Sequence, residues 1–271
     1  MALFVILIEP SSTGKSVFSG EVLHNPRFGV RNSHRKIHII SKGAVDGLID
    51  NPLQPIIDEV NAGSDKYELW PIEDLADAEN IFKILVAAND PEQGGTRVVK
   101  GQLRDLIYID DFASDIRNNT WFHKRLEKCR NVQQEHTDVW VVSQSLDRTT
   151  GLPPCALDCF DHIVAMARAV KFKDRIASKI ELGAWKPPQK TKQQALKEKI
   201  VETAWKGVPG SEKDSNYNFF YLNMKEKQED GTYLMMSNFD GEIKAAMPQM
   251  IKPLSAKYSE ALAEARRYVC A

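Results

Sequence analysis

The sequence predicts an α/β fold of three layers with a mainly parallel sheet, followed by a C-terminal β-hairpin and helices. Three observations support this class. Short continuous apolar runs recur between residues 3 and 167, which is typical of strands buried on both faces of a parallel sheet. Helical patterns lie between these runs, and such alternation implies a parallel sheet. The 271 residues are 42% hydrophobic and 27% charged, an ordinary globular composition that does not favour disorder.

The apolar runs are predicted as strands, in the order 3–8, 36–41, 105–110, 138–144 and 161–167. No basic segment precedes the first run and a polar loop follows it directly, so a buried strand is favoured over a secretory signal. No run approaches the ~18 apolar residues of a membrane span. We therefore expect a soluble protein without a membrane span.

Two stretches in the first part of the chain show helical periodicity. Residues 73–88 carry an apolar stripe, and residues 119–131 carry another, which predicts a helix for each. The stripe residues are Leu75, Ile81, Leu85 and Val86 in the first stretch and Trp121, Phe122, Leu126 and Cys129 in the second.

The character of the chain changes after about residue 180. Residues 191–206 are rich in lysine and predict a helix, and residues 216–224 and 231–239 predict a hairpin. A last helix is predicted over residues 254–269 from its residue propensities. We expect a core over residues 1–180 and an extension over residues 181–271 that packs on it or flanks it.

Charge and cysteine content exclude some classes of partner and site. The net charge is −1, from 36 basic and 37 acidic residues, so any nucleic-acid contact must use a local patch. The four cysteines form no C-x-x-C pair and the histidines are scattered, which predicts thiols in a reducing compartment and no metal cluster.

The segment EPSSTGKS, residues 9–16, follows the first predicted strand. A phosphate-binding loop aims backbone N–H groups at phosphate oxygens from a helix N-terminus, with a lysine for charge and a hydroxyl for Mg²⁺. Gly14, Lys15 and Ser16 supply these parts, although Glu9 stands where the pattern has its first glycine. The alternative is a polar connector in which a serine caps the helix. The predicted nucleotide-binding residues are Pro10, Ser11, Ser12, Thr13, Gly14, Lys15, Ser16 and Val17.

Two later strands end in groups that suit the same chemistry. LIYIDD, residues 106–111, delivers Asp110 as a ligand for Mg²⁺ together with Ser16, and Asp111 as a general base. An Asp-Asp helix cap is the alternative. VWVVSQS, residues 139–145, puts Gln144 at the end of a predicted strand, where it can orient the attacking water, although a glutamine there is often only the start of a loop. Together these residues predict a site that hydrolyses ATP with Mg²⁺.

The order of these motifs resembles the RecA-like ASCE P-loop ATPases, and among them the FtsK/HerA superfamily of DNA translocases and viral genome-packaging ATPases. The matching segments are TGKSV (13–17), LIYIDD (106–111), CRNVQQEHTDVWVVSQS (129–145) and LPPCALDCFDHIVAMA (152–167), within about residues 1–170. The resemblance implies ATP at the subunit interfaces of a ring, usually a hexamer, and a cytoplasmic or virion location.

The resemblance also implies an arginine that reaches the γ-phosphate of a neighbouring subunit. Arg130 is the position carried over, with Arg148 and Arg168 as substitutes; a cation at a helix C-terminus is the alternative role of Arg130. Glu9 and Asp111 depart from the family, which has glycine in the loop and glutamate as base. These departures put the rate of hydrolysis in doubt.

Two basic stretches are the candidates for DNA contact. Residues 168–179 carry five basic residues against Asp174, and residues 186–206 carry six lysines against two glutamates; a solvated helix face is the alternative. The sequence thus favours an ATP-driven motor on double-stranded DNA. A nucleotide-binding scaffold is the second hypothesis, and a small-molecule kinase, which lacks a compact arginine-rich lid here, is the third.

Overall fold

The structure, a computed structural model, describes residues 4–8, 15–26, 29–88, 95, 103–110, 137–143, 160–166, 173–182, 186–206, 219–227 and 233–237. The chain divides into two compact units, the first made of Met1–Leu7 and Gly14–Phe160 and the second of Ile8–Thr13 and Asp161–Ala271. The predicted boundary at residue 180 stays a prediction.

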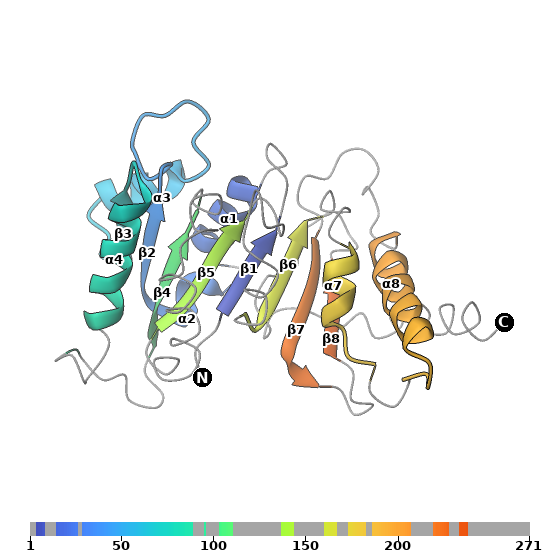
Figure 1. Cartoon of the computed structure of the whole chain (residues 1–271). Coiled ribbons are helices and arrows are strands. Elements are labelled where there is room, and N and C mark those ends of the chain that lie inside the picture. Colours follow the sequence, from blue (N-terminus) through green and yellow to red (C-terminus); the bar gives the residue numbers. More distant parts are fainter. Residues whose placement is uncertain are drawn as a thin grey trace. The chain divides into compact units, whose positions relative to one another are not determined.

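The first unit is built on strands that follow the order β3-β2-β4-β5-β1 (Figure 1). Strand β2 pairs in parallel with β3 and with β4, and β4 pairs in parallel with β5. The predicted α/β class with a parallel sheet is confirmed. Four of the five predicted runs form strands of this unit, and the fifth, residues 161–167, forms a strand of the second unit. The bounds are β1 Phe4–Ile8, β2 His34–Ser41, β3 Tyr67–Pro71, β4 Arg104–Ile109 and β5 Thr137–Ser143.

The central strands are buried on both faces, as their unbroken apolar runs predict. Every residue of 106–109 in β4 and 139–142 in β5 is buried. The register aligns Ile40 of β2 with Ile109 of β4, and Ile109 with Val141 of β5. These strands therefore end close to one edge of the sheet, at the position of Asp110.

Four helices belong to the described part of this unit. They are α1 Lys15–His24, α2 Val30–Ser33, α3 Gln54–Asn61 and α4 Leu75–Ala88. Helix α4 confirms the prediction for residues 73–88, but its buried face is Ala78, Phe82, Leu85 and Val86, while Ile81 is only half-buried. The predicted stripe was wrong at Ile81 because the larger aromatic side chain of Phe82 takes the inward position. The helix predicted over residues 119–131 lies outside the described residues.

Helix α1 approaches the segment before α3 so closely that only glycine fits at position 20. A Cβ atom on Gly20 would lie 2.3 Å from the carbonyl oxygen of Pro52. We therefore expect Gly20→Ala to destabilise the protein by about 1–3 kcal/mol through overpacking, against the preference of an isolated helix for alanine. The free energy of unfolding in urea measures this effect. The control is Gly43→Ala, whose Cβ would meet nothing nearer than Ser41 Oγ at 3.5 Å; equal stability of the two variants would contradict the steric explanation.

The described part of the second unit contains three antiparallel strands and two helices. Strand β6 (His162–Met166) pairs with β7 (Phe219–Lys227), and β7 pairs with β8 (Tyr233–Ser237). The predicted hairpin is thus confirmed. Helix α8 (Lys190–Lys206) confirms the prediction for residues 191–206, and it packs against α7 (Lys173–Lys179), which the sequence did not predict. The helix predicted over residues 254–269 lies outside the described residues. In the described part of the chain, no helix combines the length and apolar character that a membrane span requires.

Candidate functional site

Ser16 and Asp110 lie 94 positions apart in the sequence and meet in the fold. Ser16 is the second residue of α1, and Asp110 directly follows the last residue of β4. The Ser16 hydroxyl donates a hydrogen bond to Asp110 Oδ2 over 3.2 Å. Asp110 is only 1% exposed. The structure thus brings together the two residues that the sequence predicted as metal ligands.

Asp110 is also held by one residue of β2 and by one residue of β4, the strand that it follows. Its backbone N–H donates to the carbonyl oxygen of Ile40 in β2 over 3.1 Å. The hydroxyl of Tyr108 donates to Asp110 Oδ2 over 3.0 Å. The buried Tyr108 ring meets Trp140 of β5 edge to face, with the ring centroids 6.0 Å apart. The position of the carboxylate is therefore fixed by both backbone and side-chain contacts.

The sequence interpretation missed Tyr108. It stands inside an apolar run and was counted there as core. Residues two apart on a strand point to the same face of the sheet. The spacing of two between the tyrosine and the aspartate therefore indicates that the tyrosine hydroxyl can reach the carboxylate.

The chemistry of this pair fits Mg²⁺ bound with a nucleotide. Mg²⁺ prefers oxygen ligands and is usually held by one or two carboxylates together with substrate phosphates and waters. A serine hydroxyl keeps lone pairs for a metal while its proton bonds a carboxylate, which is the arrangement of Ser16 and Asp110. Ser16 also lies in the first turn of α1, where the partial positive charge of the helix favours phosphate. Among the described residues, no group of three His, Cys, Asp or Glu side chains could hold a metal by itself.

Strand β5 lies between β4 and β1 in the sheet order. It runs parallel to β4, so its last residue, the fully buried Ser143, lies at the same edge as Asp110. Strand β5, which Gln144 follows in the sequence, therefore lies between β4, which Asp110 follows, and β1, which the predicted phosphate loop follows.

Most other predicted site residues lie outside the described part of the chain. For Lys15 the structure gives the backbone, which begins α1, and Val17 is 38% exposed in the same helix. The structure therefore brings together Ser16 and Asp110 and leaves the other assignments as predictions. Those outside are Pro10, Ser11, Ser12, Thr13, Gly14, Asp111, Arg130 and Gln144, and also Glu9, Arg148 and Arg168.

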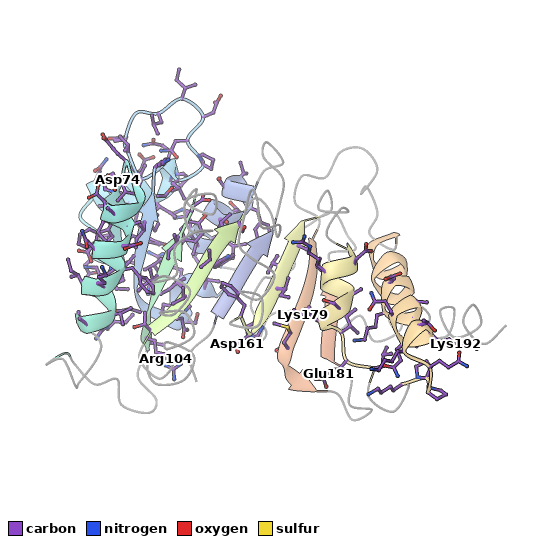
Figure 2. The ribbon with its side chains drawn as sticks, viewed as in Figure 1. Asp74, Arg104, Asp161, Lys179, Glu181 and Lys192 are labelled. Carbon is purple, nitrogen blue, oxygen red and sulfur yellow. The ribbon has the colours of Figure 1, made fainter. Side chains whose placement is uncertain are left out.

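A buried ion pair lies at the opposite edge, where the parallel strands begin. His34 of β2 is 1% exposed, with Nδ1 2.8 Å from Val30 O and Nε2 3.0 Å from Asp138 Oδ2 in β5. Asp138 Oδ1 also lies 3.5 Å from Arg104, which is labelled in Figure 2. His34 thus links Val30 of α2 to Asp138 of β5, and Asp138 lies between His34 and Arg104.

A second ion pair at this edge joins β2 to β4. Arg35 donates to both carboxylate oxygens of Asp105, over 2.8 Å and 2.6 Å, and His38 Nε2 lies 3.5 Å from Asp105 Oδ2. Burial by itself raises the pKa of Asp105, but the contacts with His38 and with the Arg35 guanidinium lower it well below its usual range. This carboxylate is therefore ionised and structural.

The second unit carries basic side chains around the start of α8. Lys186, Lys190 and Lys192 are exposed, and Figure 2 labels Lys192 together with Glu181 near the end of α7. Burial lowers the pKa of Lys197, the charge of Glu181 raises it, and the charge of Lys186 lowers it again. Burial is the largest of these effects.

The chain matches no family model and no curated protein. It is similar to solved structures at low identity. The pCW3 conjugation coupling protein TcpA, solved as a monomer with ATPγS, is 10% identical with a TM-score of 0.46, covering 92% of this chain and 63% of that one. The genome packaging NTPase B204 of Sulfolobus turreted icosahedral virus 2, with ATPγS, is 10% identical with a TM-score of 0.44, covering 88% and 98%.

The cytoplasmic domain of the Thermomonospora curvata type VII secretion ATPase EccC is 8% identical with a TM-score of 0.42, covering 97% of this chain and 28% of that one. This chain thus spans less than two thirds of the length of the TcpA and EccC chains. The names of these proteins describe a conjugation coupling protein, a genome packaging NTPase and a secretion ATPase.

Proposed function

We propose that the protein is an ATP-hydrolysing motor that translocates or packages double-stranded DNA as a ring of identical subunits. The observation that carries the proposal is the contact between the Ser16 hydroxyl and the buried Asp110 carboxylate. It joins the helix that follows the predicted phosphate loop to the strand end that supplies a metal ligand. Mg²⁺ bound there neutralises the negative charge that develops on the transferred phosphoryl group.

The other roles in hydrolysis follow from the sequence. Pro10 to Val17 hold the phosphates, with Lys15 as their cation. Asp111 accepts a proton from the attacking water, Gln144 orients that water, and Arg130 of a neighbouring subunit stabilises the γ-phosphate. Asp111 follows Asp110 directly in the chain, so the proposed base and the metal ligand come from one strand end.

DNA is the proposed substrate of the movement. Lys186, Lys190 and Lys192 are exposed, and they lie around the start of α8. Proteins that grip DNA without regard to sequence neutralise its phosphates with lysine and arginine. The name of the viral B204 protein, a genome packaging NTPase, is compatible with such a substrate.

A nucleotide-binding scaffold without turnover is the second candidate, favoured by Glu9 in the loop and by Asp111 in place of a glutamate base. ATP turnover separates the candidates, measured for the wild type and for Lys15→Ala, each with and without double-stranded DNA. We expect wild-type turnover that rises with DNA and falls in Lys15→Ala by about a hundredfold or more. The stimulation by DNA should weaken as salt rises.

The control is Lys83→Ala, which removes an exposed lysine of α4 whose Nζ lies 3.9 Å from Glu79. It should keep wild-type turnover and stimulation. An unstimulated wild type that stays monomeric with ATP would rule out the motor. Binding of ATP without turnover would favour the scaffold.

A further inference from the structure

We infer that Tyr108 positions the metal-binding carboxylate, and that its hydroxyl sets the Mg²⁺ affinity of the nucleotide site; this rests on the function proposed above. Asp110 Oδ2 accepts two hydroxyl hydrogen bonds, one from Ser16 over 3.2 Å and one from Tyr108 over 3.0 Å. The Ser16 hydroxyl belongs to the proposed metal site itself. The Tyr108 hydroxyl comes from the same strand as Asp110 and acts on the metal through it.

The packing of Tyr108 makes its hydroxyl a fixed donor. The side chain is fully buried in β4, and its ring packs edge to face against Trp140, with an interplanar angle of 83°. Trp140 is itself 1% exposed and stands opposite Tyr108 in the strand register. The tyrosine therefore has no room to turn, and its O–H group stays directed at Asp110.

A fixed donor on Oδ2 restricts the rotation of the carboxylate. The backbone N–H of Asp110 is already bonded to Ile40 O, so the main chain is held while the Tyr108 hydroxyl holds the side chain. Groups that orient a metal ligand without touching the metal commonly change metal affinity by about 10–100-fold. The carboxylate of Asp110 is thus pre-oriented for Mg²⁺ before the nucleotide arrives, which lowers the cost of binding.

The test is Tyr108→Phe, which removes the hydroxyl and keeps the ring. Binding of a fluorescent, non-hydrolysable ATP analogue is followed in a titration with MgCl₂ and again in EDTA. We expect the Mg²⁺ concentration for half-maximal binding to rise by about tenfold. Affinity for the analogue in EDTA should stay unchanged, because the hydroxyl acts only through Asp110 and the metal.

The matched control is Tyr67→Phe. Tyr67 is also buried, at 3% exposure, and its hydroxyl donates to the carbonyl oxygen of Leu23 over 2.9 Å. Both variants lose a buried hydroxyl that donates a hydrogen bond, and Tyr67→Phe also loses a contact with Arg31, so Tyr67→Phe should lose at least as much thermal stability. Only Tyr108→Phe should change the Mg²⁺ dependence. Tyr108→Met, which fills the site without a hydroxyl, repeats the test if the first variant fails to fold.

The outcomes separate this inference from the function on which it rests. Wild-type protein that binds the analogue equally with MgCl₂ and EDTA would refute the proposed metal site and Tyr108's role with it. A Mg²⁺-dependent wild type with an unchanged Tyr108→Phe titration would overturn the role of Tyr108 alone. An equal shift in Tyr67→Phe would show that any buried hydroxyl has this effect, and would likewise overturn it.

Discussion

Replacing Asp110 by asparagine is expected to reduce ATP turnover by about a hundredfold or more while leaving the fold intact. The amide keeps the shape of the carboxylate, and its oxygen can still accept the hydroxyls of Ser16 and Tyr108. It loses the negative charge that holds Mg²⁺, and removing such preorganised stabilisation of the reacting phosphates costs about 10²–10³ in rate. Steady-state hydrolysis of ATP and the free energy of unfolding in urea are measured on the same preparation.

The matched control for this prediction is Asp105→Asn. Both aspartates are buried. Asp110 directly follows the last residue of β4, whereas Asp105 lies at the start of β4 and pairs with Arg35. We expect Asp105→Asn to lower the free energy of unfolding and to keep the ATP turnover of the folded protein. Asp110→Asn should instead keep the stability and lose the turnover. If both variants lose turnover in proportion to lost stability, Asp110 has a structural role only.

The largest effect on stability is expected from His34→Ala, about 3 kcal/mol. Removing the imidazole leaves the buried Asp138 carboxylate without one of its hydrogen-bond partners, which costs about 1–3 kcal/mol and more for a charged group. Asp138 keeps its contact with Arg104 at 3.5 Å, and we expect about 3 kcal/mol because the packing of the buried ring is lost as well. The free energy of unfolding, from urea denaturation followed by circular dichroism, gives the difference from wild type.

His24→Ala is the control for the loss of a histidine. The His24 side chain is 37% exposed and its Nδ1 lies 3.4 Å from Glu59, and exposed pairs contribute about 0–1 kcal/mol. Comparable losses of stability in His34→Ala and His24→Ala would mean that burial does not determine how much the His34–Asp138 pair contributes to stability.

The sequence predicted the strands correctly where the burial of apolar side chains is the dominant contribution. The runs in β2, β4 and β5 are buried on both faces, so burial alone marks them in the sequence. Strand β3, YELWP, was missed because Glu68 interrupts its apolar residues, it ends in proline, and only Tyr67 is buried. It lies at one end of the strand order. Helix α7 was taken only as a basic stretch, although Ile176 and Ala177 are buried beneath its charges.

The sequence predicted that Ser16 and Asp110 belong to one site, but it did not predict the groups that hold Asp110 in place. Ser16 and Asp110 follow from chemistry, since a hydroxyl and a carboxylate at the ends of neighbouring elements suit Mg²⁺. The direction of the Tyr108 hydroxyl depends on Trp140, which is 32 positions away in the chain and faces it only through strand pairing. The partner of His34 at position 138 likewise depends on tertiary contact. Side-chain direction set by distant residues leaves no pattern in a single sequence.

Strand β4 keeps the charged pairs at its start apart from the carboxylate at its end. Asp105 and Asp110 are separated by roughly 16 Å at ~3.3 Å per residue, and substitutions farther apart than about 7–10 Å without shared partners usually add independently. The edge of the sheet where the parallel strands begin is therefore suited to stabilising substitutions. Apolar residues of matching volume there, replacing a whole ion pair, often stabilise a protein, and they would do so without altering what the other edge binds.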